Sequence, residues 1–108
     1  MNESSDQNHP TLSSSQRKQL RGLAHHLQPV VHIGERGLAD TVMLELDEAL
    51  QRHELIKIRF VDFLDEKKRL LGEIEERLAA RSAGTVGHVA ILYRRHPDPE
   101  QRRIRLKG

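Results

Sequence analysis

The sequence predicts an α/β (α+β) fold in which three helices pack on a mixed four-stranded sheet, in the order α-β-α-β-α-β-β. Two observations lead to this prediction. Three segments place apolar residues at helical spacing, and the segments between them are rich in β-branched residues that alternate with polar ones. Elements that alternate in this way are typical of a sheet covered by helices. With 108 residues, the chain is long enough for one domain with its own core.

The chain begins with a polar arm and a first helix. Residues 1–12 are rich in Ser and Asn and show no periodicity, so we expect a disordered N-terminal arm followed by a single domain over residues 13–108. Ser13–Ser15 offer an N-cap for the helix. Pro29 ends it, because a residue before proline is pushed out of the α region. The apolar face of this helix consists of Leu20, Leu23, Ala24 and Leu27.

A short strand over residues 30–33 precedes a second helix, which carries Asp40 in its first turn and ends near Arg52 or His53. The apolar positions of this helix are Leu38, Val42, Met43, Leu46, Ala49 and Leu50. The following segment, ELIKIRFVD, alternates as a strand. Its apolar face consists of Ile56, Ile58 and Phe60, and its partly basic face carries Lys57 and Arg59.

The last third of the sequence predicts a third helix and two more strands. The helix runs from about Asp65 to Arg81, with Leu71, Ile74 and Leu78 facing inward and Gly84 as the stop signal. The segments HVAILYRR (88–95) and RRIRL (102–106) are expected to be the third and fourth strands. Two prolines in the intervening HPDPEQ favour a turn between them.

Composition excludes several classes of protein. Only 3% of the residues are aromatic, which argues against recognition by stacked aromatic side chains. The chain has no cysteine and no apolar run long enough to span a membrane, so we expect a cytoplasmic protein. The net charge of +2 is unevenly spread, because residues 94–108 carry six Lys/Arg against two acids. Such a basic region suits contact with a polyanion, although a solvated tail has the same composition.

The motif Gly34-Glu35-Arg36-Gly37 lies between a predicted strand and a predicted helix. The unpaired N–H groups at a helix start favour an anion, and glycines let a phosphate approach the backbone closely. Leu38 and Ala39 replace the Lys-Ser/Thr of a Walker A loop, the dinucleotide fingerprint lacks its first glycine, and a KH loop joins two helices rather than a strand and a helix. A phosphate seat and a tight turn without a ligand both remain open at this point.

Arg17, Lys18 and Arg21 are expected to form a basic patch beside this motif, since their helix feeds directly into the preceding strand; a solvated helical face is the alternative. The histidines show no metal-ligand spacing, because His25 and His26 are adjacent on a helix and point apart. No carboxylate pair sits in an apolar setting and no nucleophile motif is present. We therefore expect no catalytic residue, metal, cofactor or small-molecule substrate.

Three segments, LRGLAHHLQPVVHIGERGL, HELIKIR and AILYRR, resemble the signature segments of the CRM domain, named for chloroplast RNA splicing and ribosome maturation. The chain is most similar to its stand-alone bacterial form, the YhbY family, over about residues 12–95. The resemblance implies an RNA-binding module whose fold is similar to the C-terminal domain of bacterial translation initiation factor three. It also implies association with precursor ribosomal particles, chiefly those of the large subunit.

The resemblance assigns the family's RNA-contacting loop to Gly34, Glu35, Arg36 and Gly37. It assigns the family's strand lysine to Lys57 and its Leu-Tyr-Arg to Leu92, Tyr93 and Arg94. Three departures stand out. Gln28 replaces the lysine that commonly precedes the proline, the segment RSAGTVGHV matches poorly, and the tail from His96 matches no motif.

These inferences predict a non-catalytic protein that binds ribosomal RNA or its precursor without a membrane partner. The loop and the following helix start would hold phosphates, while Arg36, Lys57, Arg94 and the first-helix residues Arg17, Lys18 and Arg21 supply positive potential. Glu35 is then expected to face away from the loop backbone. The alternative is a protein-interaction adaptor that docks through the acidic second helix, around Glu45, Asp47 and Glu48. The same acidic face disfavours DNA binding through that helix.

Overall fold

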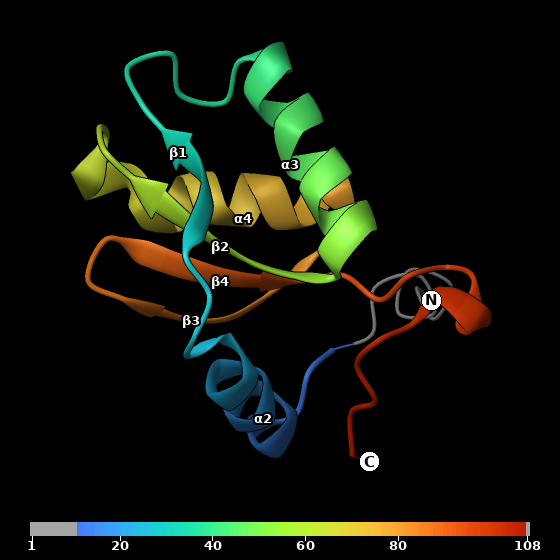
Figure 1. The fold of residues 1–108 in the computed structure, drawn as a ribbon. Helices are drawn as coiled ribbons and strands as arrows, with labels where there is room; N and C mark the ends of the chain where they lie inside the picture. Colours follow the sequence, from blue (N-terminus) through green and yellow to red (C-terminus); the bar gives the residue numbers. More distant parts are fainter. Residues whose placement is uncertain (1–10, 108) are drawn as a thin grey trace, which may run out of the picture.

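The computed structural model describes residues 11–107 and contains a four-stranded mixed sheet within them (Figure 1). The strands are β1 (Pro29–Ile33), β2 (Leu55–Phe60), β3 (Arg81–Val86) and β4 (Val89–Tyr93), in the spatial order β1-β2-β4-β3. β1 runs parallel to β2, whereas β4 is antiparallel to both of its neighbours. The predicted fold class and element order are therefore confirmed.

The helices are α2 (Ser14–Ala24), α3 (Asp40–His53) and α4 (Lys67–Leu78). A short 3-10 turn, Leu64–Glu66, precedes α4, and a second one, Pro99–Gln101, follows β4. α2 begins as predicted: the Ser13 hydroxyl oxygen accepts from the Gln16 N–H, and the Ser13 N–H donates to Gln16 Oε1, which forms a capping box. α3 starts at Asp40 and ends at His53. Within residues 11–107, no helix has the length and apolar character needed to cross a membrane.

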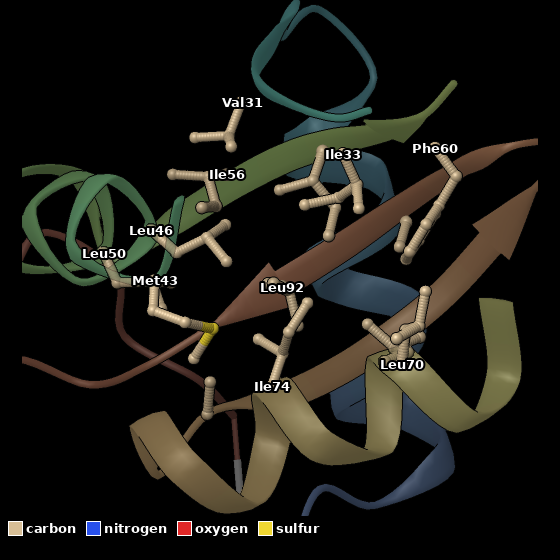
Figure 2. Packing of buried hydrophobic residues seen from close by; sticks show 14 residues of the cluster. Val31, Ile33, Met43, Leu46, Leu50, Ile56, Phe60, Leu70, Ile74 and Leu92 are labelled. Carbon is tan, nitrogen blue, oxygen red and sulfur yellow. The ribbon is translucent and has the colours of Figure 1, made fainter. Parts of the chain in front are cut away.

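One face of the sheet forms the main core with α3 and α4 (Figures 1 and 2). Ile56, Ile58 and Phe60 of β2 point into it, as the alternating pattern predicted. α3 contributes Met43, Leu46 and Leu50, and α4 contributes Leu70, Leu71 and Ile74. Figure 2 shows the labelled side chains of β2, α3 and α4 gathered between the strands and the two helices. Burial of this cluster fixes which side of each strand faces solvent.

The predicted fourth strand is wrong, and so is the stop signal assigned to Gly84. The third helix ends earlier, where Ala79 adopts a left-handed conformation (φ 55°), and β3 follows at Arg81. β3 pairs with β4 through a two-residue Gly87-His88 turn, a common hairpin connection. A register shift between Ser82 and Gly84 interrupts the alternation of β3, which explains why the pattern did not indicate a strand.

Residues 102–106 form no strand, and their backbone groups bond to side chains instead. The buried Glu54 carboxylate accepts hydrogen bonds from the backbone N–H groups of His96 (2.7 Å), Arg103 (2.8 Å) and Ile104 (3.2 Å). Glu54 itself sits between α3 and β2 with φ 64°, a conformation that non-glycine residues rarely adopt. Glu54 thus fastens the C-terminal segment (residues 96–107) to the body of the domain.

The second face of the sheet is covered over only part of its area. α2 and the C-terminal segment pack there in a smaller apolar cluster that contains Leu20, Leu55, Ile91 and Tyr93, with Ile104 and Leu106 packed against it. Leu12 is buried in the same cluster, at the end of the predicted arm; the remainder of that arm, residues 1–10, lies outside the described residues. The uncovered part of this face is where the basic residues of β2 emerge.

The Glu54 carboxylate gives a testable prediction. Exchanging it for an amide, Glu54→Gln, replaces one acceptor oxygen by a donor that faces backbone N–H groups. We expect a loss of about 1–3 kcal/mol in the free energy of unfolding, the usual cost of a buried unsatisfied group, measured by urea denaturation. The exposed Glu48→Gln on α3 is the control and should change it by less than about 0.5 kcal/mol. Equal stability of the two variants would contradict the anchoring role of Glu54.

Candidate functional site

The Gly34–Gly37 motif forms a tight turn at the end of β1. The N–H of Gly37 donates to the carbonyl oxygen of Gly34 (2.9 Å), and Glu35 and Arg36 lie exposed at the tip. The fold constrains the two glycines differently. Gly37 has φ +59°, and a Cβ there would lie 3.6 Å from the Phe63 ring, whereas a Cβ on Gly34 would meet nothing within 4 Å. Only Gly37 is therefore demanded by the fold.

The turn leads directly into α3, whose first N–H groups receive no side-chain cap. Ala39 occupies the N-cap position and offers no acceptor, and Asp40 supplies a carboxylate in the first turn. Glu35 is exposed, and its carboxylate accepts no hydrogen bond from residues 11–107, so it is not tied to the backbone of the turn. The backbone around Gly34 is open to a ligand from outside.

The open face of the sheet lies next to this turn. Lys57 and Arg59 project from β2 on the side opposite the main core, and His32 of β1 is the register partner of Arg59. A groove of about 540 Å³ runs over this face between the strands and α2. Its charged or titratable lining residues are Arg21, His25, Lys57 and Arg59. Within the groove lining, no acidic residue offsets these cations.

Arg21 reaches this groove by crossing β3. Its guanidinium donates to the Ala83 carbonyl oxygen (2.9 Å), and its Cδ lies 3.1 Å from where a Cβ on Gly84 would be. A side chain at position 84 would push Arg21 away, and the φ of +145° there is itself unfavourable for other residues. Gly84 therefore positions a cation from α2 over the open face.

The first-helix residues do not form the expected patch beside the turn. α2 connects to the start of β1, whereas the turn follows its end, as Figure 1 shows. Arg17 donates to the Leu12 carbonyl oxygen (2.8 Å) near the start of α2, and neither Arg17 nor Lys18 lines the groove. Of the three basic residues, only Arg21 joins Lys57, because it alone lies far enough along the helix to meet β3.

Arg94 lies at the opposite end of the sheet from the turn. Tyr93 pairs with Leu55 at one end of β2, and the turn follows Ile33, which pairs with Phe60 at the other. At about 3.3 Å per residue, these ends are about 17 Å apart. The Arg94 guanidinium contacts Asp47 Oδ1 (2.7 Å), the Asp47 carbonyl (3.0 Å) and the Leu78 carbonyl (3.0 Å). These bonds link α3, α4 and β4 and account for Arg94 as a structural residue.

The neighbours of Arg94 are internal. Leu92 belongs to the main core, and Tyr93 packs under the C-terminal segment. Burial raises the pKa of the Tyr93 phenol above its ordinary value, and the Glu54 charge adds to this shift while Arg95 and Arg102 oppose it. Because the folded chain disfavours the phenolate, the contribution of Tyr93 to stability is complete below the ordinary tyrosine pKa and declines as the pH rises through the raised one.

The structure adds residues that were not among the sequence candidates. Arg59 lies on the same face as Lys57, and the alternation of β2 already contained that signal. Phe63 has 41% of its surface exposed, whereas Phe60 and Tyr93 are buried, so it supplies the one exposed aromatic ring beside the turn. Its left-handed conformation (φ 55°) could not be predicted from sequence. Among residues 11–107, no group of three or more metal-ligating side chains occurs.

Comparison with known proteins shows a consistent set of relatives. Residues 12–94 match the model of the CRS1/YhbY (CRM) domain. A Haemophilus influenzae protein named as RNA-binding is 41% identical over 97 residues, covering 89% of this chain and 95% of that protein. A probable RNA-binding protein of Pseudomonas aeruginosa is 35% identical over 91 residues, covering 83% and 88%.

A solved structure has the same fold. The solution structure of a hypothetical Staphylococcus aureus protein, for which RNA binding is suggested, superposes with a TM-score of 0.73 at 26% identity. The match covers 88% of this chain and 100% of that one. The arrangement of sheet and helices described above is therefore shared with an experimentally determined relative.

The two glycines of the turn should respond differently to the same substitution. Gly37→Ala forces an alanine into a left-handed conformation, and we expect it to lower the free energy of unfolding by about 1–2 kcal/mol. Gly34→Ala should leave that free energy unchanged or raise it slightly, because no atom opposes the new methyl group. Thermal denaturation of both variants provides the measurement. A destabilised Gly34→Ala would show that the first glycine is also required by the fold.

Proposed function

Because the chain belongs to the CRS1/YhbY (CRM) family, we propose that it binds RNA through the Gly34–Gly37 turn and the adjoining open face of the sheet. The observation that carries this proposal is the groove lined by Arg21, Lys57 and Arg59, which contains no acidic residue and lies on the same side of the sheet as exposed His32. The relatives named as RNA-binding proteins support the same ligand.

The proposed mechanism relies on phosphates. A phosphate can approach the backbone at Gly34, where no Cβ intervenes, and meet the uncapped N–H groups at the start of α3. Arg36 at the tip of the turn adds a charge-assisted contact. The cations of the open face then follow the sugar–phosphate backbone across β2. Phe63 offers one ring for a base, so recognition depends mainly on RNA shape and charge.

The partner that we propose is ribosomal RNA or its precursor, bound in precursor particles of the large subunit in the cytoplasm. This finer assignment is supported by the resemblance to the bacterial members of the family. A non-catalytic role fits the same site, because its residues supply positive charge and backbone donors but no paired acid and base.

Charge removal on the open face tests the site. Lys57→Gln/Arg59→Gln should weaken binding to a structured ribosomal RNA fragment about tenfold or more. It should also make the slope of log K against log salt concentration less steep by about two, because each lost phosphate contact removes nearly one unit. Fluorescence anisotropy over a series of salt concentrations gives both quantities. Arg52→Gln/Lys68→Gln removes the same charge from exposed positions on α3 and α4, and its affinity should stay within about twofold. If both double variants bound the RNA with the same affinity and salt dependence, the open face would be excluded as the RNA-binding site.

Two substitutions test the turn. Gly34→Ala adds only a methyl group, and Arg36→Glu reverses a charge on an exposed side chain, so neither disturbs the core. We expect each to weaken RNA binding about fivefold or more, which corresponds to roughly 1 kcal/mol. Glu35→Gln is the control for the second exchange and should bind at least as tightly as the parent. Unchanged affinity of a folded Gly34→Ala would argue that no phosphate approaches this backbone.

One observation favours the adaptor alternative. On α3, Leu44 is 59% exposed and lies beside the exposed acids Glu45 and Glu48, a combination suited to contact with a basic protein. Asp47 is less available, because it pairs with Arg94. Affinity purification after nuclease treatment separates the two functions. An adaptor retains its protein partner and loses it in Leu44→Gln, whereas an RNA-dependent association disappears with the RNA.

A further inference from the structure

The C-terminal segment (residues 96–107) is held in place along its length. Gln19 donates from Nε2 to the Arg105 carbonyl (3.0 Å) and accepts from the Lys107 N–H (3.1 Å), while Gln16 donates to the Lys107 carbonyl (3.2 Å). Ile104 and Leu106 pack against the smaller apolar cluster. The basic excess of this region is therefore displayed on a defined surface and is not a solvated tail.

This docking creates a second groove, of about 730 Å³, between the segment, the start of α2 and the ends of β3 and β4. Tyr93 and Leu12 contribute to its lining, and the charged residues that line it are all arginines: Arg81, Arg94, Arg95, Arg102 and Arg105. No acidic residue lines the groove. A concave surface that gathers one sign of charge between protein walls concentrates a polyanion there.

The arginines of the groove differ in the hydrogen bonds and ion pairs that they form within the protein. Arg94 pairs with Asp47, and Arg102 donates to the His96 carbonyl (2.7 Å), which holds its guanidinium in place. Arg95 and Arg105 are exposed, and their side chains form no hydrogen bond or ion pair with another residue in the range 11–107. Two guanidinium groups thus remain for a ligand, and their planar donors match phosphate oxygens.

We propose that this groove is a second RNA-binding site, which receives the phosphates of an RNA segment other than the one on the open face. The inference rests on the proposed function, and it adds that one chain holds two RNA segments at once. The two sites are separate, because the arginine groove and the groove on the open face share no lining residue. The Gly34–Gly37 turn lies farther still, at the opposite end of β2 from Tyr93.

The lining favours RNA over an acidic protein. Protein interfaces depend on exposed apolar or aromatic anchors at their centre. The large apolar side chains that are exposed within residues 11–107 lie elsewhere, and none lines this groove. The groove instead offers arginines from β3, from the residues after β4 and from the C-terminal segment, arranged around a small apolar floor.

The test measures how many RNA molecules one full-length chain binds. A short RNA hairpin is titrated by calorimetry, and donor- and acceptor-labelled copies of it report whether one chain brings two together. The parent should bind two hairpins and give energy transfer. Arg95→Gln/Arg105→Gln should bind one and give no transfer, and so should Lys57→Gln/Arg59→Gln, which retains the arginine groove. Arg103→Gln/Lys107→Gln removes the same charge from the same segment outside the groove lining, and it should still bind two.

The outcomes distinguish this inference from the proposed function. A parent that binds no RNA overturns both. A parent that binds one hairpin, with equal affinity for the groove variant and the tail control, overturns the second site and leaves the first standing. If the groove variant keeps two hairpins but loses an acidic protein from a nuclease-treated lysate, the groove is a protein site and the inference is wrong. Thermal melts verify folding, and Arg95→Gln alone replaces the double variant if that one unfolds.

Discussion

The sheet has two faces, and the helices of the described residues cover them unequally. α3 and α4 pack on one face to form the main core, while α2 and the C-terminal segment cover only part of the other. A strand alternates its side chains between the two faces, so β2 must be apolar on one side and is free to be basic on the other. The position of half-buried Lys57 and exposed Arg59 on the less covered face is a direct consequence of this unequal covering.

Long-range charge contacts join the layers where apolar packing ends. Arg94 connects α3 and α4 to the end of β4, and Arg21 bridges α2 and β3 through a backbone carbonyl. The guanidinium of Arg94 is engaged by these internal bonds, whereas Arg21 also lines a groove that faces solvent. Two arginines therefore differ in function according to the number of hydrogen-bond acceptors that the protein places around each guanidinium.

The sequence predicted those helices and strands whose pattern of apolar residues, caps and prolines lies within the element itself. The three helices, β1, β2 and β4 were predicted from periodicity, caps and prolines, and the Gly34–Gly37 turn was correctly placed between a strand and a helix. β3 was missed because a register shift breaks its alternation. Residues 102–106 have the alternation of a strand, but their backbone groups bond to the side chains of Glu54 and Gln19, which lie far away in sequence.

The candidate site was predictable where it depends on one strand and unpredictable where it depends on packing between elements. Alternation alone puts Lys57 on the open face. The inclusion of Arg21 and the separation of Arg17 and Lys18 depend on the position of α2 over β3, which no local pattern encodes. The internal role of Arg94 likewise requires Asp47 and Leu78 to meet it in space.

The Glu54 carboxylate accepts hydrogen bonds from backbone N–H groups, so these bonds do not depend on which side chains residues 96, 103 and 104 carry. The packing of Ile104 and Leu106, by contrast, does depend on the side chains of the C-terminal segment. Residues 96, 103 and 104 can change without losing these three bonds, except to proline, which has no N–H to donate. Substitutions at exposed positions such as Arg103 and Arg105 can therefore alter the charge displayed along this segment without removing the backbone contacts that set its course.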